Sequence, residues 1–296
     1  MATKSMAMMG AVVRGVDRLS PALGARVAAR IFMSPRPARV PERERSWLEQ
    51  ARPEVFPAGG FRLKGHRWGA SGPPVLLVHG WEGRGSQLGG LALTIAEQGF
   101  QSITIDLPAH GASPGGQTNL LEIAESVGSM VKHLGGVAGI VAHSFGASGT
   151  TVALREPLAV GRVVYLAPTE DFDHYPRLFG QWLGLSGPLS ERMQHSIERR
   201  LGATMAELRG SLIAPRMKAP LLVIHDEEDV DVPWRDGKTY SELWPGARLL
   251  TTRGHGHRRI LREAEVLSAV ALFFAESGLK SRGQGRNQDQ GFPGSE

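Results

Sequence analysis

The feature that most constrains this chain is an alternation of short apolar runs with amphipathic segments, which begins near residue 61. Runs such as Pro74-Val-Leu-Leu-Val-His-Gly and Ala138-Gly-Ile-Val-Ala-His are almost continuously apolar, as strands buried on both faces are. Segments with helical periodicity separate these runs, at 88–98, 120–134 and 147–154. Strands that alternate with helices predict an α/β fold with a mostly parallel, doubly wound sheet.

One long segment, residues 169–217, interrupts this alternation. It is too long for a simple crossover, and its apolar side chains follow helical spacing around Phe179 and Trp182. We expect a small helical cap, inserted after the sixth strand and lying over the carboxyl ends of the strands. The core of the fold then consists of residues 41–168 and 218–278.

The two ends of the chain lie outside this predicted core. Residues 1–40 predict an N-terminal helical extension, and residues 279–296, rich in Gly, Gln, Asn and Ser, predict a disordered tail. In the extension, helical spacing puts Val12, Val16 and Leu19 on one face and Leu23, Val27 and Ile31 on another. We expect these helices to dock on the main domain. The alternative is a basic amphipathic surface in peripheral contact with a membrane.

Composition excludes several classes of protein. The chain has no cysteine, which excludes disulfides, Cys-based zinc sites and a Cys nucleophile and is compatible with the cytoplasmic location that we expect. The net charge of +5 is spread along the chain without a basic stripe and interleaved aromatics, so no nucleic-acid partner is expected. No apolar run approaches the roughly 20 residues that span a bilayer, and no signal-peptide pattern is evident.

The strongest local motif is Ala142-His143-Ser144-Phe145-Gly146, which follows a buried strand and precedes a helix. A tight strand–turn–helix lifts a serine above the sheet, and small residues must flank it because strand and helix cross closely. Gly146 meets this need, and Ala142 replaces the usual first glycine. The alternative interpretation is a buried serine in a packing motif of small residues.

Four motifs together make residues 61–276 similar to the α/β-hydrolase superfamily. The first is the strand–turn–helix motif around Ser144. Val78-His79-Gly80-Trp81 resembles the loop that supplies part of the oxyanion hole, and Asp106-Leu-Pro-Ala-His110-Gly-Ala-Ser113 resembles the loop D-x-P-x-H-G-x-S. Asp229-Val-Asp-Val-Pro and Gly256-His257 resemble the acid and histidine loops, in the chain order that this superfamily uses.

The resemblance implies a catalytic triad in which Ser144 is the nucleophile, His257 the general base and Asp229 the acid that orients the histidine. His255 is the alternative base and Asp171 the alternative acid. We expect His79, His110 and His143 to be hydrogen-bonding scaffold residues. The His255-Gly-His257 pair offers no obvious third ligand, so neither a metal nor any other cofactor is expected.

The resemblance also implies the rest of the site. The backbone N–H groups of Trp81 and Phe145 would hold the oxyanion, and Phe179, Trp182 and Leu183 would form an apolar pocket for a small-molecule acyl substrate. The expected reaction is cleavage of a carboxylic ester through an acyl-enzyme. The alternatives are thioester cleavage, carbon–carbon cleavage or acyl transfer on the same triad, or a non-catalytic binding protein on this scaffold.

Overall fold

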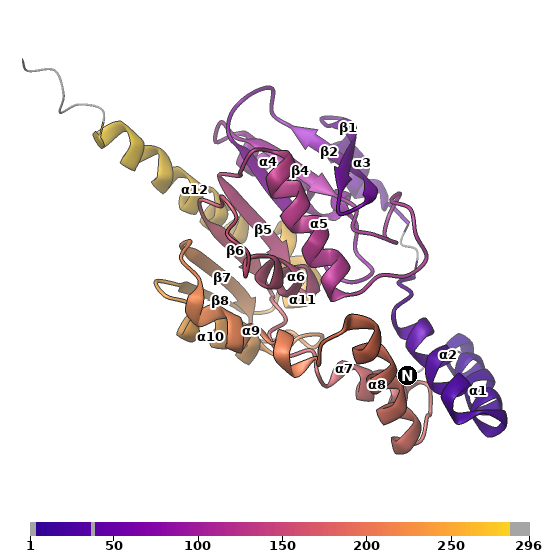
Figure 1. Ribbon diagram of the computed structural model, residues 1–296. Coiled ribbons are helices and arrows are strands. Elements are labelled where there is room, and N and C mark those ends of the chain that lie inside the picture. Colours follow the sequence, from indigo (N-terminus) through magenta and orange to yellow (C-terminus); the bar gives the residue numbers. More distant parts are fainter. Residues whose placement is uncertain (1–3, 37–38, 285–296) are drawn as a thin grey trace, which may run out of the picture.

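A single eight-stranded sheet forms the centre of the molecule (Figure 1). The structure is a computed structural model that describes residues 4–36 and 39–284. The strand order is β1-β2-β4-β3-β5-β6-β7-β8; β2 runs antiparallel to both β1 and β4, and every other neighbouring pair is parallel. The predicted α/β fold with a mostly parallel sheet is therefore confirmed. The strands are β1 (Arg52–Ala58), β2 (Phe61–Trp68), β3 (Pro74–Val78), β4 (Gln101–Ile105), β5 (Gly139–His143), β6 (Val163–Leu166), β7 (Leu221–Asp226) and β8 (Arg248–Thr252).

Helices cover both faces of the sheet and create two apolar cores. Alternate residues of β3 face opposite cores: Leu76 and Val78 belong to one, and Val75 and Leu77 belong to the other. This two-sided burial explains why the central strands read as continuous apolar runs. One core is covered by α5 (Leu120–His133), α6 (Phe145–Ala153) and α10 (Trp234–Leu243), and the other by α3 (Glu42–Leu48), α4 (Gly89–Ala96) and α12 (Ala264–Gln284).

The sequence pattern did not predict the first strand. β1 contains Pro53 and Pro57, which cannot donate backbone hydrogen bonds, and proline argues against a central strand. β1 lies at the edge of the sheet and pairs only with β2, so a missing donor can face solvent there.

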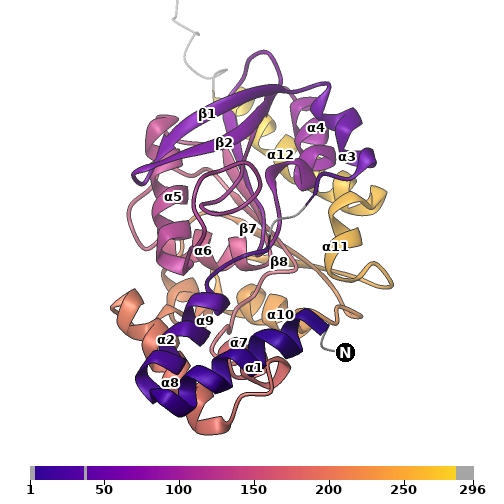
Figure 2. The same cartoon turned by 90° about the vertical axis from the view of Figure 1, so that its right-hand side faces the viewer.

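A helical insertion follows β6, as predicted. It contains α7 (Tyr175–Trp182), α8 (Gly187–Leu201) and α9 (Gly210–Ile213), together with the short 3-10 helices η2 (Ala206–Leu208) and η3 (Ala214–Arg216). Figure 2 shows α7 and α8 below the sheet, on the side where α6 and α11 (Gly256–Arg259) begin.

The N-terminal helices α1 (Lys4–Leu19) and α2 (Pro21–Phe32) form a hairpin that docks on α7 and α8 (Figure 2). Arg14 donates hydrogen bonds to the carbonyl oxygens of Leu183 and Gly184, 2.8 and 3.1 Å away. Asp17 pairs with Arg192 of α8 at 2.8 Å. The hairpin thus docks mainly on the insertion, and a hydrogen bond of 3.0 Å from the Gln117 side chain to the Arg30 carbonyl oxygen also joins α2 to the sheet domain.

The buried face of this hairpin also differs from the predicted one. Val12 and Leu19 were expected in an interface, yet they are exposed, whereas Val13 is fully buried. The reason is close backbone packing, because a side chain at Gly10 would collide with the carbonyl oxygen of Leu183. Small residues, rather than the larger apolar ones, therefore line the contact.

The last helix extends into the segment predicted as the C-terminal tail. α12 continues to Gln284, beyond residue 279 where the disordered tail was expected to begin. Leucine, lysine and arginine are good helix formers, and no proline interrupts this stretch. The remainder of the predicted tail, 285–296, lies outside the described residues. No helix within 4–36 and 39–284, α12 included, combines the length and apolarity needed to cross a bilayer.

Candidate active site

Ser144 occupies a sharp turn between β5 and α6. Its backbone has φ 53° and ψ −127°, a conformation that costs energy for any residue with a side chain. A Cβ at Gly146 would lie 2.3 Å from the carbonyl oxygen of His79, and a Cβ at Gly80 would lie 2.8 Å from the Ser144 Cβ. Glycine at these two positions therefore lets the loop after β3 pack directly against the serine turn.

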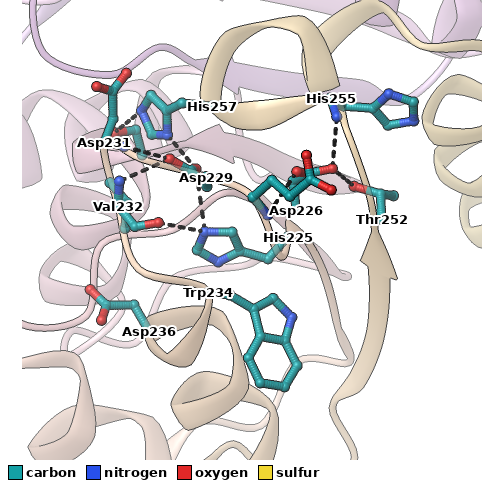
Figure 3. A network of polar contacts seen from close by, with 12 residues as sticks. His225, Asp226, Asp229, Asp231, Val232, Trp234, Asp236, Thr252, His255 and His257 are labelled. Atoms are coloured by element: carbon teal, nitrogen blue, oxygen red, sulfur yellow. Dashed lines mark hydrogen bonds and ion pairs between the residues drawn. The ribbon is translucent and has the colours of Figure 1, made fainter.

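His257 lies between Ser144 and Asp229. Its Nε2 atom is 2.9 Å from the hydroxyl oxygen of Ser144, and its Nδ1 atom is 2.7 Å from Oδ2 of Asp229. Figure 3 shows the second of these contacts. Since a carboxylate only accepts, Nδ1–H donates to Asp229, and Nε2 is left as the acceptor for the serine hydroxyl. The three residues come from separate loops at the carboxyl ends of β5, β7 and β8.

The carboxylate of Asp229 has a full set of donors. Oδ1 accepts the backbone N–H groups of Asp231 and Val232, both at 2.9 Å, in addition to the contact of Oδ2 with His257. Burial alone would raise the pKa of Asp229, but hydrogen bonds from His225, His257 and the Val232 backbone outweigh it and hold the pKa well below its usual range. The group is therefore a stable anion beside the imidazole.

His225 is a part of this site that the sequence motifs did not identify. It lies near the end of β7 with its side chain fully buried, and its Nε2–H donates to the Val232 carbonyl oxygen at 3.2 Å (Figure 3). The same nitrogen is 3.4 Å from Oδ2 of Asp229. His225 thus holds the loop that carries Asp229. The sequence signal that could have identified it was a histidine inside an otherwise apolar strand that leads into that loop.

The alternative acid and base have other partners. His255 contacts Glu265 on α12, with Nε2 2.6 Å from Oε1. Asp171 pairs with Arg209 at 3.2 Å. The geometry therefore favours His257 and Asp229 over both alternatives. No cluster of three or more potential metal ligands occurs within the described part of the chain.

Asp226 joins the acid loop to the histidine loop. Its carboxylate is buried and accepts hydrogen bonds from the Thr252 hydroxyl at 2.8 Å and from the His255 backbone N–H at 3.0 Å (Figure 3). Burial would raise the pKa of Asp226, but these donors hold it below its ordinary value. Asp226 therefore fixes where the loop after β8 begins.

Two of the three histidines expected to be scaffold residues, His79 and His110, each bridge backbone segments. His79 accepts the N–H of Leu107 at 3.0 Å and donates to the Gly80 carbonyl oxygen at 2.7 Å. His110 accepts the N–H of Glu82 at 3.0 Å. Burial lowers the pKa of both rings, so they are neutral and can accept these bonds.

The two backbone groups proposed for the oxyanion flank the serine. Phe145 is the first residue of α6, so its N–H has no acceptor within the helix and lies at the positive end of the helix dipole. Trp81 follows Gly80, whose backbone packs against Ser144. The Trp81 and Phe145 rings meet edge to face, with centroids 5.8 Å apart, so the side chains of these residues also form one wall.

A cavity of about 1210 Å³ opens above Ser144 and His257. The insertion contributes Phe179 and Trp182, and the N-terminal hairpin contributes further apolar residues. Leu183 does not line the cavity, and this part of the pocket prediction is wrong. Leu183 caps the C-terminal end of α7, where its side chain is buried and its carbonyl oxygen accepts a hydrogen bond from Arg14.

Known structures with the same fold include enzymes of several kinds. An esterase of Pyrococcus furiosus, Pf2001, is 18% identical, with a TM-score of 0.63 over 82% of this chain and 98% of its own. Est1E of Butyrivibrio proteoclasticus, solved with ferulic acid, is 18% identical, with a TM-score of 0.61 over 78% of this chain and 99% of its own. A meta-cleavage product hydrolase of Pseudomonas fluorescens is 18% identical, with a TM-score of 0.57 over 76% of this chain and 98% of its own.

At these identities the likeness concerns the fold. No curated protein matches the chain by sequence. The model of the alpha/beta hydrolase family matches residues 75–270, which include the serine turn, the helical insertion, the acid loop and the histidine loop. Together with the sheet order and the insertion after β6, this match identifies the chain as a member of the alpha/beta hydrolase family.

Proposed function

We propose that this protein is a serine hydrolase that cleaves carboxylic esters with an apolar acyl group. The observation that carries the proposal is the continuous hydrogen-bonded chain from Ser144 through His257 to Asp229, with contacts of 2.9 and 2.7 Å, at the floor of a large cavity. A serine hydroxyl needs an adjacent base to become a nucleophile, and this chain supplies one.

In the first step, the Ser144 oxygen attacks the acyl carbon of the ester while His257 Nε2 takes the hydroxyl proton. Asp229 stabilises the imidazolium that forms and keeps Nδ1 protonated. The negative charge on the former carbonyl oxygen is held by the N–H groups of Phe145 and Trp81, where one donor contributes on the order of 3 kcal/mol in enzymes of this type. His257 then returns the proton to the leaving alcohol, and an acyl-enzyme remains.

In the second step, water attacks the acyl carbon while His257 takes one of its protons. The ester bond to Ser144 breaks, His257 returns the proton to the serine oxygen, and a carboxylic acid leaves. Both steps use the same base and the same oxyanion donors, and neither needs an oxidant or a reductant.

The preference for an apolar acyl group follows from the cavity. Its lining on the side of the insertion includes Phe179, Ile197 and Leu201, and the hairpin adds Val27 and Ile31. These apolar side chains favour an apolar acyl group in their part of the cavity, whose lining elsewhere includes charged residues such as Arg30, Arg84 and Arg258. Esterases occur among the structural relatives, and a carbon–carbon hydrolase does too, so the type of bond needs its own test.

The experiment is a steady-state comparison of p-nitrophenyl esters, acyl thioesters and a carbon–carbon substrate, with wild type, Ser144→Ala and Ser34→Ala. Ser34 lines the same cavity, but its hydroxyl donates to the Arg30 carbonyl oxygen at 2.8 Å, so it is the matched control. We expect ester turnover that falls on the order of 10⁴-fold or more in Ser144→Ala and persists in Ser34→Ala. Turnover confined to thioesters would correct the bond type, and equal activity of all three proteins would overturn the proposal.

A further inference from the structure

The outer face of helix α1 carries an exposed apolar stripe. Met8, Val12 and Leu19 are 67%, 57% and 89% exposed, and Leu23 at the start of α2 is 48% exposed. Spacings of four and seven residues put the first three on one side of the helix. Gly15 lies between them on the same side, and a side chain there would meet nothing within 4 Å. Figure 2 shows α1 on the outside of the hairpin, away from the sheet.

The opposite face of α1 belongs to the cavity. Met6 and Met9 line the space above Ser144, and Val13 is fully buried. Trp182, which is half exposed, lines the same cavity from α7. One helix therefore separates the proposed acyl cavity from the exterior, with apolar side chains on both of its sides.

The charges of the hairpin are almost all positive. Asp17 is the only acidic residue between positions 4 and 34, and it is neutralised by Arg192 at 2.8 Å. Arg18 and Arg26 are exposed, and neither takes part in an ion pair within the described part of the chain. Arg30 is exposed too, but it lines the cavity. An apolar stripe flanked by unpaired arginines complements a surface that is apolar below a layer of negative charge.

We infer that the α1–α2 hairpin docks on an anionic lipid surface, with Met8, Val12, Leu19 and Leu23 at the acyl boundary and the arginines among the headgroups. α1 has 16 residues, so at about 1.5 Å per residue it would lie flat over about 24 Å of that surface. A second copy of the chain fits less well, because a symmetric pairing through this face would bring like arginines together. This docking is separate from catalysis and does not depend on the proposed triad.

The test is sedimentation of the full chain with vesicles of phosphatidylcholine alone or of equal amounts of phosphatidylcholine and phosphatidylglycerol. We expect binding to the mixed vesicles that weakens with added salt, since screening reduces the attraction of the arginines. The triple variant Met8→Ser, Val12→Ser, Leu19→Ser should bind at least roughly tenfold more weakly, because it removes the apolar contact.

The controls separate docking from folding and from catalysis. Leu272→Ser removes an exposed apolar residue from α12, outside the hairpin, and should bind as wild type does. The triple variant should keep wild-type turnover of a short soluble ester, and Ser144→Ala should keep wild-type vesicle binding. Failure of wild type to bind mixed vesicles, or equal binding by the triple variant, would overturn the inference. So would a dimer that the triple variant converts to a monomer, because the face would then be covered by a second copy.

Discussion

Nε2 of His143 donates a hydrogen bond to the backbone carbonyl oxygen of His257, 2.9 Å away. The residue that precedes the proposed nucleophile thus holds the loop that carries the proposed base. The two imidazole rings lie close, with centroids 4.7 Å apart. Nδ1 of His143 is buried without a hydrogen-bond partner within the described structure, so a proton there would be an uncompensated charge. Burial, together with the nearby His257, lowers the pKa of His143 to about 3.

This relationship predicts a specific acid sensitivity of folding. The unfolded chain protonates His143 near the ordinary pKa of 6.5, whereas the folded chain does so at about 3. Between these values the unfolded state binds more protons, so stability falls as pH decreases from about 6.5 towards 3 and is unaffected above that window. We expect His143→Gln to have a lower free energy of unfolding than wild type at neutral pH. The difference in unfolding free energy between the two proteins should narrow by about 2 kcal/mol between about pH 8 and about pH 5.

Urea unfolding at the two pH values measures this gap. His195→Gln, on the exposed surface of α8, is the control for loss of a histidine as such. A gap between wild type and His143→Gln that stays constant with pH would contradict the account of His143.

The acid assignment predicts a sharp contrast between two aspartates. Asp229→Asn keeps the shape of the side chain but removes the charge and allows the wrong imidazole tautomer, so we expect kcat to fall roughly 10⁴-fold. Asp171→Asn should keep kcat within a few fold of wild type, because Asp171 contacts Arg209 and not His257. Asp231→Asn, in the same loop as Asp229, is the matched control. The opposite order of the two main variants would transfer the acid role to Asp171.

The close packing at the serine turn predicts that an added methyl group is harmful at Gly146. Its Cβ would lie 2.3 Å from the His79 carbonyl oxygen, a backbone atom that cannot move aside. We expect Gly146→Ala to lose about 1–3 kcal/mol of unfolding free energy. The matched helical glycine is Gly128 in α5, whose nearest neighbour would be 3.9 Å away. Gly128→Ala should be neutral or slightly stabilising in the same urea titration, and equal losses in both variants would refute the packing argument.

The cavity predicts a dependence of specificity on the insertion. Phe179 lines the cavity and meets the Phe32 ring of the hairpin edge to face, with centroids 5.3 Å apart. Removing this wall should lower kcat/KM for an octanoyl ester roughly tenfold while acetyl ester turnover changes little. Leu212, which is exposed on α9 and does not line the cavity, provides the control variant Leu212→Ala. Equal loss for both esters in Phe179→Ala would exclude the acyl-pocket assignment.

Much of the fold could be predicted because its signals are local. Buried parallel strands such as β3 and β5 are continuous apolar runs, and the turn at Ser144 requires small flanking residues at fixed positions. Asp229 lies 85 residues after Ser144, and His257 lies 28 residues after Asp229. The three side chains nevertheless meet, because their loops share one edge of the sheet. The order of motifs along the chain was enough to select them.

The remaining features depend on tertiary contacts that no local pattern encodes. The hairpin buries Val13 through glycine contacts with another segment and leaves Val12 exposed, so amphipathic spacing alone selected the wrong face. His225 acts through a loop several residues away, and Leu183 is directed into the protein by the end of α7. β1 resembles a loop in sequence because only an edge strand tolerates its prolines.

The central claim is that Ser144 is an activated nucleophile, and a fluorophosphonate probe tests it most directly. Wild type, Ser144→Ala, His257→Ala and the control His255→Ala would be labelled, and the modified peptide would be identified by mass spectrometry. The account predicts one adduct per chain on Ser144 in wild type and His255→Ala, and strongly reduced labelling in the other two variants. Absence of an adduct on folded wild-type protein, or labelling of Ser144 that persists without His257, would contradict it.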